Sequence, residues 1–166
     1  MAGENDMHKG SKGFSLIELL IVVAILLVIA AIAIPNFLHS KVAANQASAV
    51  ASLRSLNTAE VAYASTYSSG FSANMVYLAP PTSGGNPNST AAGFIDSVLA
   101  AGAKSGYSFA YSAGAADSLG RINSFNFIAV PMNSFVGRNY YYIDQAGVIR
   151  MNASTTAGAS DSPIGG

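Results

Sequence analysis

The feature that most constrains this chain is a run of sixteen apolar residues, 19–34, which no charged or turn-forming residue interrupts. Between Lys12 and Lys41 the only residue with a formal charge is Glu18. As a helix, residues 14–34 would measure about 30 Å, which matches the hydrocarbon core of a bilayer. Many of these residues are β-branched, but strands rarely run so long without a turn. The sequence therefore predicts a membrane-spanning helix.

Three fates of this segment differ in whether it stays in the mature protein. A secretory signal peptide would use Lys9 and Lys12 as its basic region and would be cut after Ala33, within a small-residue pattern. A plain uncleaved anchor leaves Glu18 as an unexplained cost, since a carboxylate is unfavourable in lipid. The third fate gives Glu18 a function, because an ionisable residue in a membrane segment is a candidate functional site whose partner must be named.

The residues around this carboxylate resemble a known family. The sequence KGFSLIELL at residues 12–20, followed by the apolar run and Pro35, is similar to the N-terminus of type IV pilins and the related pseudopilins. The resemblance implies that a prepilin peptidase cuts between Gly13 and Phe14 and that the new N-terminal Phe14 is N-methylated. Residues 1–13 would then be a hydrophilic leader that is absent from the mature chain.

The resemblance also implies an assembly role for Glu18, which would pair with the N-terminal ammonium of a neighbouring subunit. A buried carboxylate and a buried ammonium are each costly alone, and each removes the other's penalty only when two subunits come into register. A second interpretation needs no partner, because an acidic residue at a helix N-terminus is favoured by the helix dipole. Pro35 removes a backbone donor and crowds the carbonyl of Ala31, so we expect a helix distortion there. The alternative interpretation is that the membrane-spanning helix simply ends at Pro35.

The remaining chain predicts an α+β fold, with a long N-terminal helix packed on a C-terminal antiparallel β-sheet of about four strands. Apolar residues recur at helical spacing beyond Pro35, and alternating strand patterns begin at Tyr107. Within the connection, Ser89 or Thr90 is the expected cap of a short helix in residues 91–103. The predicted segments are a leader (1–13), a transmembrane or filament-core helix (14–38), its amphipathic continuation (39–67), a loop with a short helix (68–104), the sheet (105–152) and a flexible tail (153–166).

Composition argues against several other functions. Only 10% of residues are charged, against about 25% in ordinary soluble domains, and the formal net charge is zero, so there is no clear nucleic-acid signal. There is no cysteine for a disulfide, a thiolate metal site or a nucleophile. The histidines are His8 and His39, and scattered carboxylates such as Asp144 and Asp161 lack the spacing of a calcium loop. We therefore expect no catalytic residue, no cofactor and no metal site.

The sequence thus predicts a structural subunit of a type IV pilus-like extracellular filament, not an enzyme. The expected partners are further copies of the chain in a homopolymer, the prepilin peptidase and methyltransferase, the inner-membrane assembly machinery, and membrane lipid before assembly. The expected location is the bacterial inner membrane as a single-pass protein, then the cell surface. The alternatives are a type II secretion pseudopilin, a secreted soluble binding domain cleaved after Ala33 and, third, a small membrane-anchored enzyme.

Overall fold

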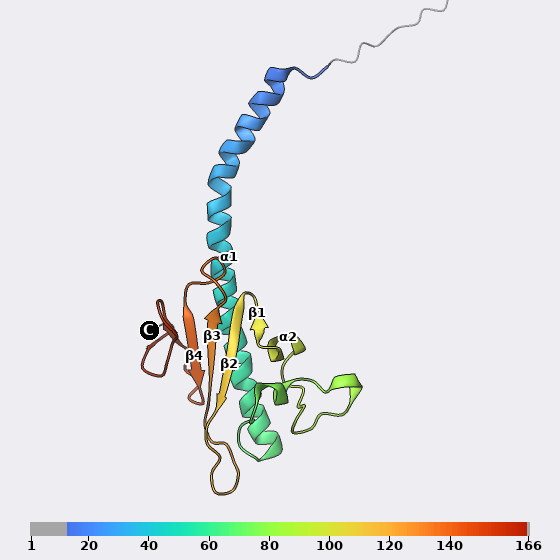
Figure 1. The fold of residues 1–166 in the computed structure, drawn as a ribbon, viewed down its shortest axis with the longest axis vertical. Coiled ribbons are helices and arrows are strands. Elements are labelled where there is room, and N and C mark those ends of the chain that lie inside the picture. Colours follow the sequence, from blue (N-terminus) through green and yellow to red (C-terminus); the bar gives the residue numbers. More distant parts are fainter. Residues whose placement is uncertain (1–12, 166) are drawn as a thin grey trace, which may run out of the picture. The chain divides into compact units, whose positions relative to one another are not determined.

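The computed structural model describes residues 13–165, which fall into two compact units that meet between Leu38 and His39. Helix α1 (Leu16–Tyr67) contributes its first part to one unit and the rest to the other. Figure 1 shows this helix, followed by the strands and loops of the second unit. The helix ends at Tyr67, directly before the sequence Ser68-Ser69-Gly70 that predicts its end.

The first unit is the apolar part of α1, and its side chains have no covering layer within their own unit. Every large apolar side chain from Leu16 to Leu38 is exposed, Leu16 at 81% and Val23, the least, at 45%. By length and composition α1 is the one described helix that could cross a membrane. The continuous apolar run therefore forms the helix that its length predicts, with its hydrophobic surface on the outside.

The second unit places the remainder of α1 beside a six-stranded antiparallel sheet whose strands follow chain order. The strands are β1 (Ala103–Lys104), β2 (Tyr107–Ala113), β3 (Phe125–Pro131), β4 (Tyr140–Asp144), β5 (Arg150–Asn152) and β6 (Ser162–Pro163). The α+β prediction is confirmed, but the predicted number of about four strands is wrong. Strands β2 to β5 carry the patterns read from the sequence, whereas β1 and β6 have two residues each and are too short for an alternating pattern.

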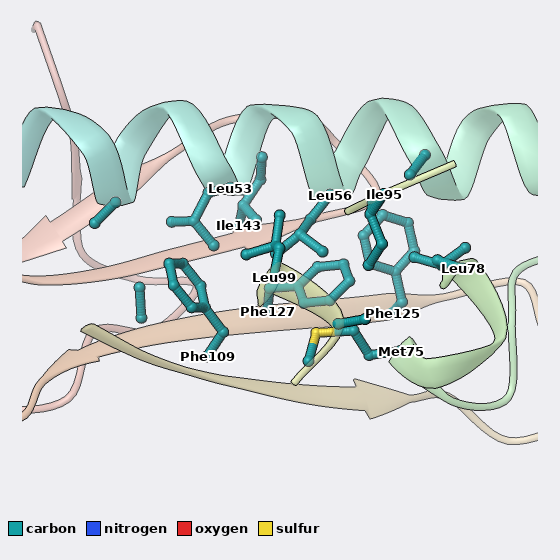
Figure 2. Close-up of a cluster of buried hydrophobic side chains, with 14 of the residues drawn as sticks. Leu53, Leu56, Met75, Leu78, Ile95, Leu99, Phe109, Phe125, Phe127 and Ile143 are labelled. Carbon is teal, nitrogen blue, oxygen red and sulfur yellow. The ribbon is translucent and has the colours of Figure 1, made fainter. Parts of the chain in front are cut away.

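The core of this unit lies between α1 and one face of the sheet, as Figure 2 shows. From the helix, Leu53 and Leu56 are fully buried and point toward the strands. Strand β3 alternates buried and half-buried residues, so Phe125 and Phe127 face the helix. Their rings meet edge to face, with centroids 5.6 Å apart, a favourable geometry for aromatic pairs. The buried face of the strands, formed by every second residue, thus packs against the buried face of α1, whose apolar residues recur at helical spacing.

The connection between α1 and the sheet contains less helix than the sequence predicts. Its elements are the 3-10 helices η1 (Met75–Leu78) and η2 (Thr82–Gly84) and the short helix α2 (Ser97–Ala100). Ser89 and Thr90 do not cap α2; the Asp96 carboxylate accepts a 2.8 Å hydrogen bond from the Leu99 N–H instead. Gly93 has a φ of +74°, which ends any regular structure before this point.

The described part of the C-terminal segment, residues 153–165, folds back on the sheet. Strand β6 pairs with β5, and Ala157 is buried. The Asp161 carboxylate accepts hydrogen bonds from the side chain of Asn152 (2.9 Å) and the N–H of Gly158 (2.8 Å). These bonds join the segment to strand β5.

Gly70 joins the end of α1 to the loop between β2 and β3 and gives a first prediction. Its φ is +80°, and an added Cβ would collide with the backbone of Ile122. We expect Gly70→Ala to lower the free energy of unfolding by about 3 kcal/mol, from the left-handed conformation and the backbone clash together. Denaturant unfolding of the detergent-solubilised full chain, followed by near-ultraviolet circular dichroism of its tyrosines, measures this change.

Gly147 is the matched control for this prediction. Its φ of +75° is similar, but the nearest atom to an added Cβ is a side-chain nitrogen of Asn57 at 3.5 Å, an ordinary contact. Gly147→Ala should therefore cost only the conformational part, about 1 kcal/mol. Equal losses for the two variants would show that the contact with Ile122 is not tight.

Candidate processing and assembly site on the N-terminal helix

The predicted cleavage junction lies in an irregular segment directly before α1. Gly13, Phe14 and Ser15 have no regular secondary structure, and the helix begins at Leu16. A Cβ added at Gly13 would meet no atom within 4 Å, and the Phe14 side chain is 75% exposed. The peptide bond between Gly13 and Phe14 is therefore open to a protease that needs an extended, accessible backbone.

Glu18 lies in the first turn of α1, where its carboxylate faces the free N–H groups of the helix end. Its Oε2 accepts a weak 3.4 Å hydrogen bond from the Ser15 N–H, and the Leu19 N–H donates to the Ser15 carbonyl at 3.2 Å. The acidic side chain is thus placed where the helix dipole favours it. It is also exposed, so a second molecule could reach it.

Pro35 lies inside α1, and helical structure continues on both sides of it. Proline has no backbone N–H, so the hydrogen bond to the Ala31 carbonyl is not available. Beside it, the side chain of Asn36 donates a 3.2 Å hydrogen bond to the carbonyl of Ile32, one helical turn before Asn36. Gly13, Phe14 and Glu18 are close together at one end of the apolar helix, while Pro35 lies near its other end.

The remaining candidate groups do not form a site in the described structure. Within residues 13–165 there is no group of three or more His, Cys, Asp or Glu that could hold a metal ion. The Asp144 carboxylate accepts from the N–H of Ala146 and the hydroxyl of Tyr142, at 3.0 and 3.4 Å. His39 lies exposed on α1 at the start of the second unit.

A buried carboxylate in the second unit, Glu60, is not among the candidate residues predicted from the sequence. Its side chain has no exposed surface. One oxygen accepts from the Ser72 N–H at 2.8 Å and the other from the Ser72 hydroxyl at 2.7 Å. Helical spacing does indicate that Glu60 is buried, because it follows the buried Leu53 and Leu56 by seven and four residues and so lies on the apolar face of α1.

The surroundings of Glu60 contain hydroxyl groups rather than a cation. Burial raises the pKa of its carboxyl above the ordinary value, against the opposing effect of the Ser72 hydrogen bonds. Tyr111 donates from its hydroxyl to the Ser72 carbonyl at 2.5 Å, and burial raises the pKa of that phenol. Glu60, Ser72 and Tyr111 thus link α1, the first residues after it and strand β2.

Comparisons with known proteins agree with the N-terminal features. The model of the prokaryotic N-terminal methylation motif matches residues 8–34. The Type IV major pilin protein PilA of Myxococcus xanthus is 47% identical over 53 residues, which make up 32% of this chain. The chain thus matches about a quarter, 24%, of that relative's length. No solved structure matches the chain.

The matched motif contains the junction between Gly13 and Phe14 together with Glu18, and it covers the whole apolar run of residues 19–34. The structure adds a long N-terminal helix followed by an antiparallel sheet. The chain thus carries the prokaryotic N-terminal methylation motif and is similar over its N-terminal part to a type IV major pilin.

Proposed function

We propose that this chain is a structural subunit of a type IV pilus-like extracellular filament, polymerised through its N-terminal helix. The observation that carries the proposal is the surface of α1 between Leu16 and Leu38, where every large apolar side chain is exposed. Such a surface is unstable in water and needs lipid or other protein around it. A bilayer before assembly and the helices of other subunits afterwards meet this need in turn.

Processing precedes assembly in this proposal. A prepilin peptidase cuts between Gly13 and Phe14, in the exposed irregular segment, and the new N-terminus is methylated. Cleavage places a positively charged amine on Phe14, one helical turn from the Glu18 carboxylate. The reaction therefore creates the cation that the apolar helix lacks.

Assembly then brings this amine to the Glu18 carboxylate of a neighbouring subunit. Each charge is costly in an apolar environment, and pairing relieves both costs. Subunits that are out of register bury one or both charges without a partner, so the pair selects a single axial offset. Pro35, which lacks one helical hydrogen bond, is the proposed point at which the helix loosens during packing.

The proposed location follows from the same helix. The chain first spans the bacterial inner membrane once and then leaves it for the cell surface, with the sheet-containing unit on the outside of the fibre. Its partners are further copies of the chain, the prepilin peptidase and methyltransferase, and the membrane-embedded assembly machinery. Contacts of this kind repeat without closing, which yields a helical polymer.

A type II secretion pseudopilin is the second candidate. The feature that favours it is the absence of cysteine, because its C-terminal segment is held by the Asp161 hydrogen bonds and not by a disulfide, which many pilins have. Deletion of the chain separates the two functions. Loss of long surface fibres supports the pilin, whereas retained fibres with loss of secreted proteins support the pseudopilin.

Mass analysis of the N-terminal peptide tests the proposal directly. We expect material sheared from the cell surface to contain a peptide that begins with methylated Phe14, and membranes to contain the same mature form. An N-terminus at Met1 in surface material would contradict processing at Gly13. Soluble protein that begins at Ile34 would instead support a secreted domain cleaved after Ala33.

A further inference from the structure

Two apolar side chains are the most exposed of the large apolar residues described in the second unit. Leu119, in the loop between β2 and β3, is 73% exposed, and Phe135, in the loop between β3 and β4, is 82% exposed. These loops leave opposite ends of β3, so they lie at opposite ends of the sheet, as Figure 1 shows. Single exposed apolar residues are common, but both of these lie on loops that are held in place.

The loop with Leu119 is fixed by the Asp117 carboxylate. One oxygen accepts from the N–H groups of Leu119 and Arg121, each at 2.9 Å, and the other accepts at 3.1 Å from the Arg121 and Asn123 side chains. These hydrogen bonds to the ionised form lower the pKa of Asp117 to about 2. The loop is thus ordered around an exposed leucine, which reduces the entropy cost of binding.

The loop with Phe135 is fixed to α1 and to the sheet. The side chain of Asn45 donates to the Val136 carbonyl at 2.9 Å, and the Tyr107 hydroxyl donates to the Asn139 carbonyl at 2.9 Å. The same loop borders an open hollow of about 520 Å³, which is lined by Ser134 and not by the Phe135 side chain. Its lining includes Pro131, Met132, Arg138 and Tyr140.

The two ends also differ in charge. On the Phe135 end, Arg138 and Lys41, one helical turn before Asn45, make no ion pair within residues 13–165. On the Leu119 end, Asp117 and Arg121 form an ion pair and cancel each other's charge, so the remaining charge is that of Asp144, which lies beside the start of β3, opposite Asn126. The last turn of α1 also lies at the Leu119 end, because Gly70, just after the helix, pairs with Ile122 in the Leu119 loop. This turn carries no basic residue, so its free carbonyl groups add negative potential at that end. The Asp161 carboxylate also lies at the Phe135 end, bonded to Asn152 opposite Tyr140. The two cations there still exceed this one anion, and an excess of opposite sign at the two ends favours contact between opposite ends of two copies.

We propose that the Leu119 loop of one copy packs into the hollow lined by Ser134 and Arg138 of the next copy in the fibre. The contact joins different surfaces of identical chains, so it repeats along the fibre and does not close. It couples the sheet-containing units, in addition to the proposed packing of the apolar helices. This inference rests on the proposed filament, and its test is designed to separate the two.

Cysteine crosslinking tests the contact with no background, because the chain has no native cysteine. Ser118 and Ser134 are exposed and directly precede Leu119 and Phe135, so Ser118→Cys and Ser134→Cys leave both apolar side chains intact. Sheared fibres of the double variant, treated with a short bismaleimide, should give a ladder of multimers in denaturing gels. Each single variant should stay monomeric, and a mixture of the two single variants should stop at dimers.

The control pair is Ser118→Cys with Ser97→Cys, which is also exposed but lies on α2. This pair should give no ladder. A ladder from the control pair, or none from Ser118→Cys with Ser134→Cys in intact fibres, would overturn the contact while leaving the filament standing. Absence of any fibre from the unsubstituted chain would overturn the proposed function itself.

A second measurement covers the case in which cysteines disturb assembly. Leu119→Asn should lower the temperature at which isolated fibres dissociate, with unchanged unfolding of the unassembled chain, because the side chain is exposed there. Val76→Asn, at a position 54% exposed on η1, should change neither temperature. A Leu119→Asn fibre as stable as the unsubstituted one would contradict the contact.

Discussion

Glu18→Ala should insert into the membrane and be processed normally, yet fail to enter filaments. In the proposed filament this substitution leaves the neighbour's ammonium buried without its partner, which costs about 3–5 kcal/mol. A loss of that size weakens association at each step at least about a hundred-fold. The yield of this variant in sheared surface material, relative to its amount in membranes, measures the effect.

Two further variants separate charge from packing at this position. Glu18→Gln keeps the size of the side chain but removes its charge, so it should fail as Glu18→Ala does. Leu16→Ala removes a larger apolar surface from the neighbouring exposed position and should still assemble. Normal fibre yield from Glu18→Ala, with a membrane form that begins at Phe14, would disprove the pairing.

The parts of the fold that the sequence predicts are those with strong local patterns. The uninterrupted run at residues 19–34 specifies a helix by its length, and the alternation in β2 and β3 specifies strands by its period. The motif around Gly13 and Glu18 is contiguous, so it needs no knowledge of the fold. For the same reason its residues are recognisable before their structural setting is known.

The parts that the sequence does not predict depend on contacts between distant residues. Strand β1 exists because the turn at Ser105 and Gly106 folds it onto β2, and β6 because Arg150 and Asn152 hold Asp161. Neither strand has enough residues to show a period of its own. Helix α2 is shorter than the helix predicted for residues 91–103, because its cap is a carboxylate within that range and not a residue before it.

Glu60 shows the same limit in the core. Helical spacing places it on the buried face, but its charge suggests the solvent face, and only the position of Ser72 decides between them. The N–H and hydroxyl of Ser72 supply the hydrogen bonds that a buried carboxylate requires. The residue therefore fixes the first turn after α1, and with it the entry to the long connection that precedes the sheet.

The stability of the second unit should depend on pH through Glu60. Burial raises its pKa in the folded state above the value in the unfolded chain. A group shifted in this direction contributes its stability fully below the unfolded pKa of about 4.3, and the contribution is lost as pH rises through the folded pKa. The contribution of Glu60 should therefore lower the unfolding temperature of the solubilised full chain at neutral pH relative to pH 4.

Glu60→Gln isolates this effect, because an amide can accept from the Ser72 N–H and donate to the Ser72 hydroxyl without becoming charged. The variant should gain stability relative to the unsubstituted chain as pH rises, and the two should converge near pH 4. Glu60→Ala should instead be less stable by about 2 kcal/mol at pH 4, because the buried donors of Ser72 lose their acceptor. Thermal unfolding of the three proteins from pH 4 to pH 8 separates the charge of Glu60 from its hydrogen bonds. Parallel curves for the Gln variant and the unsubstituted chain would show that folding does not shift the pKa of Glu60.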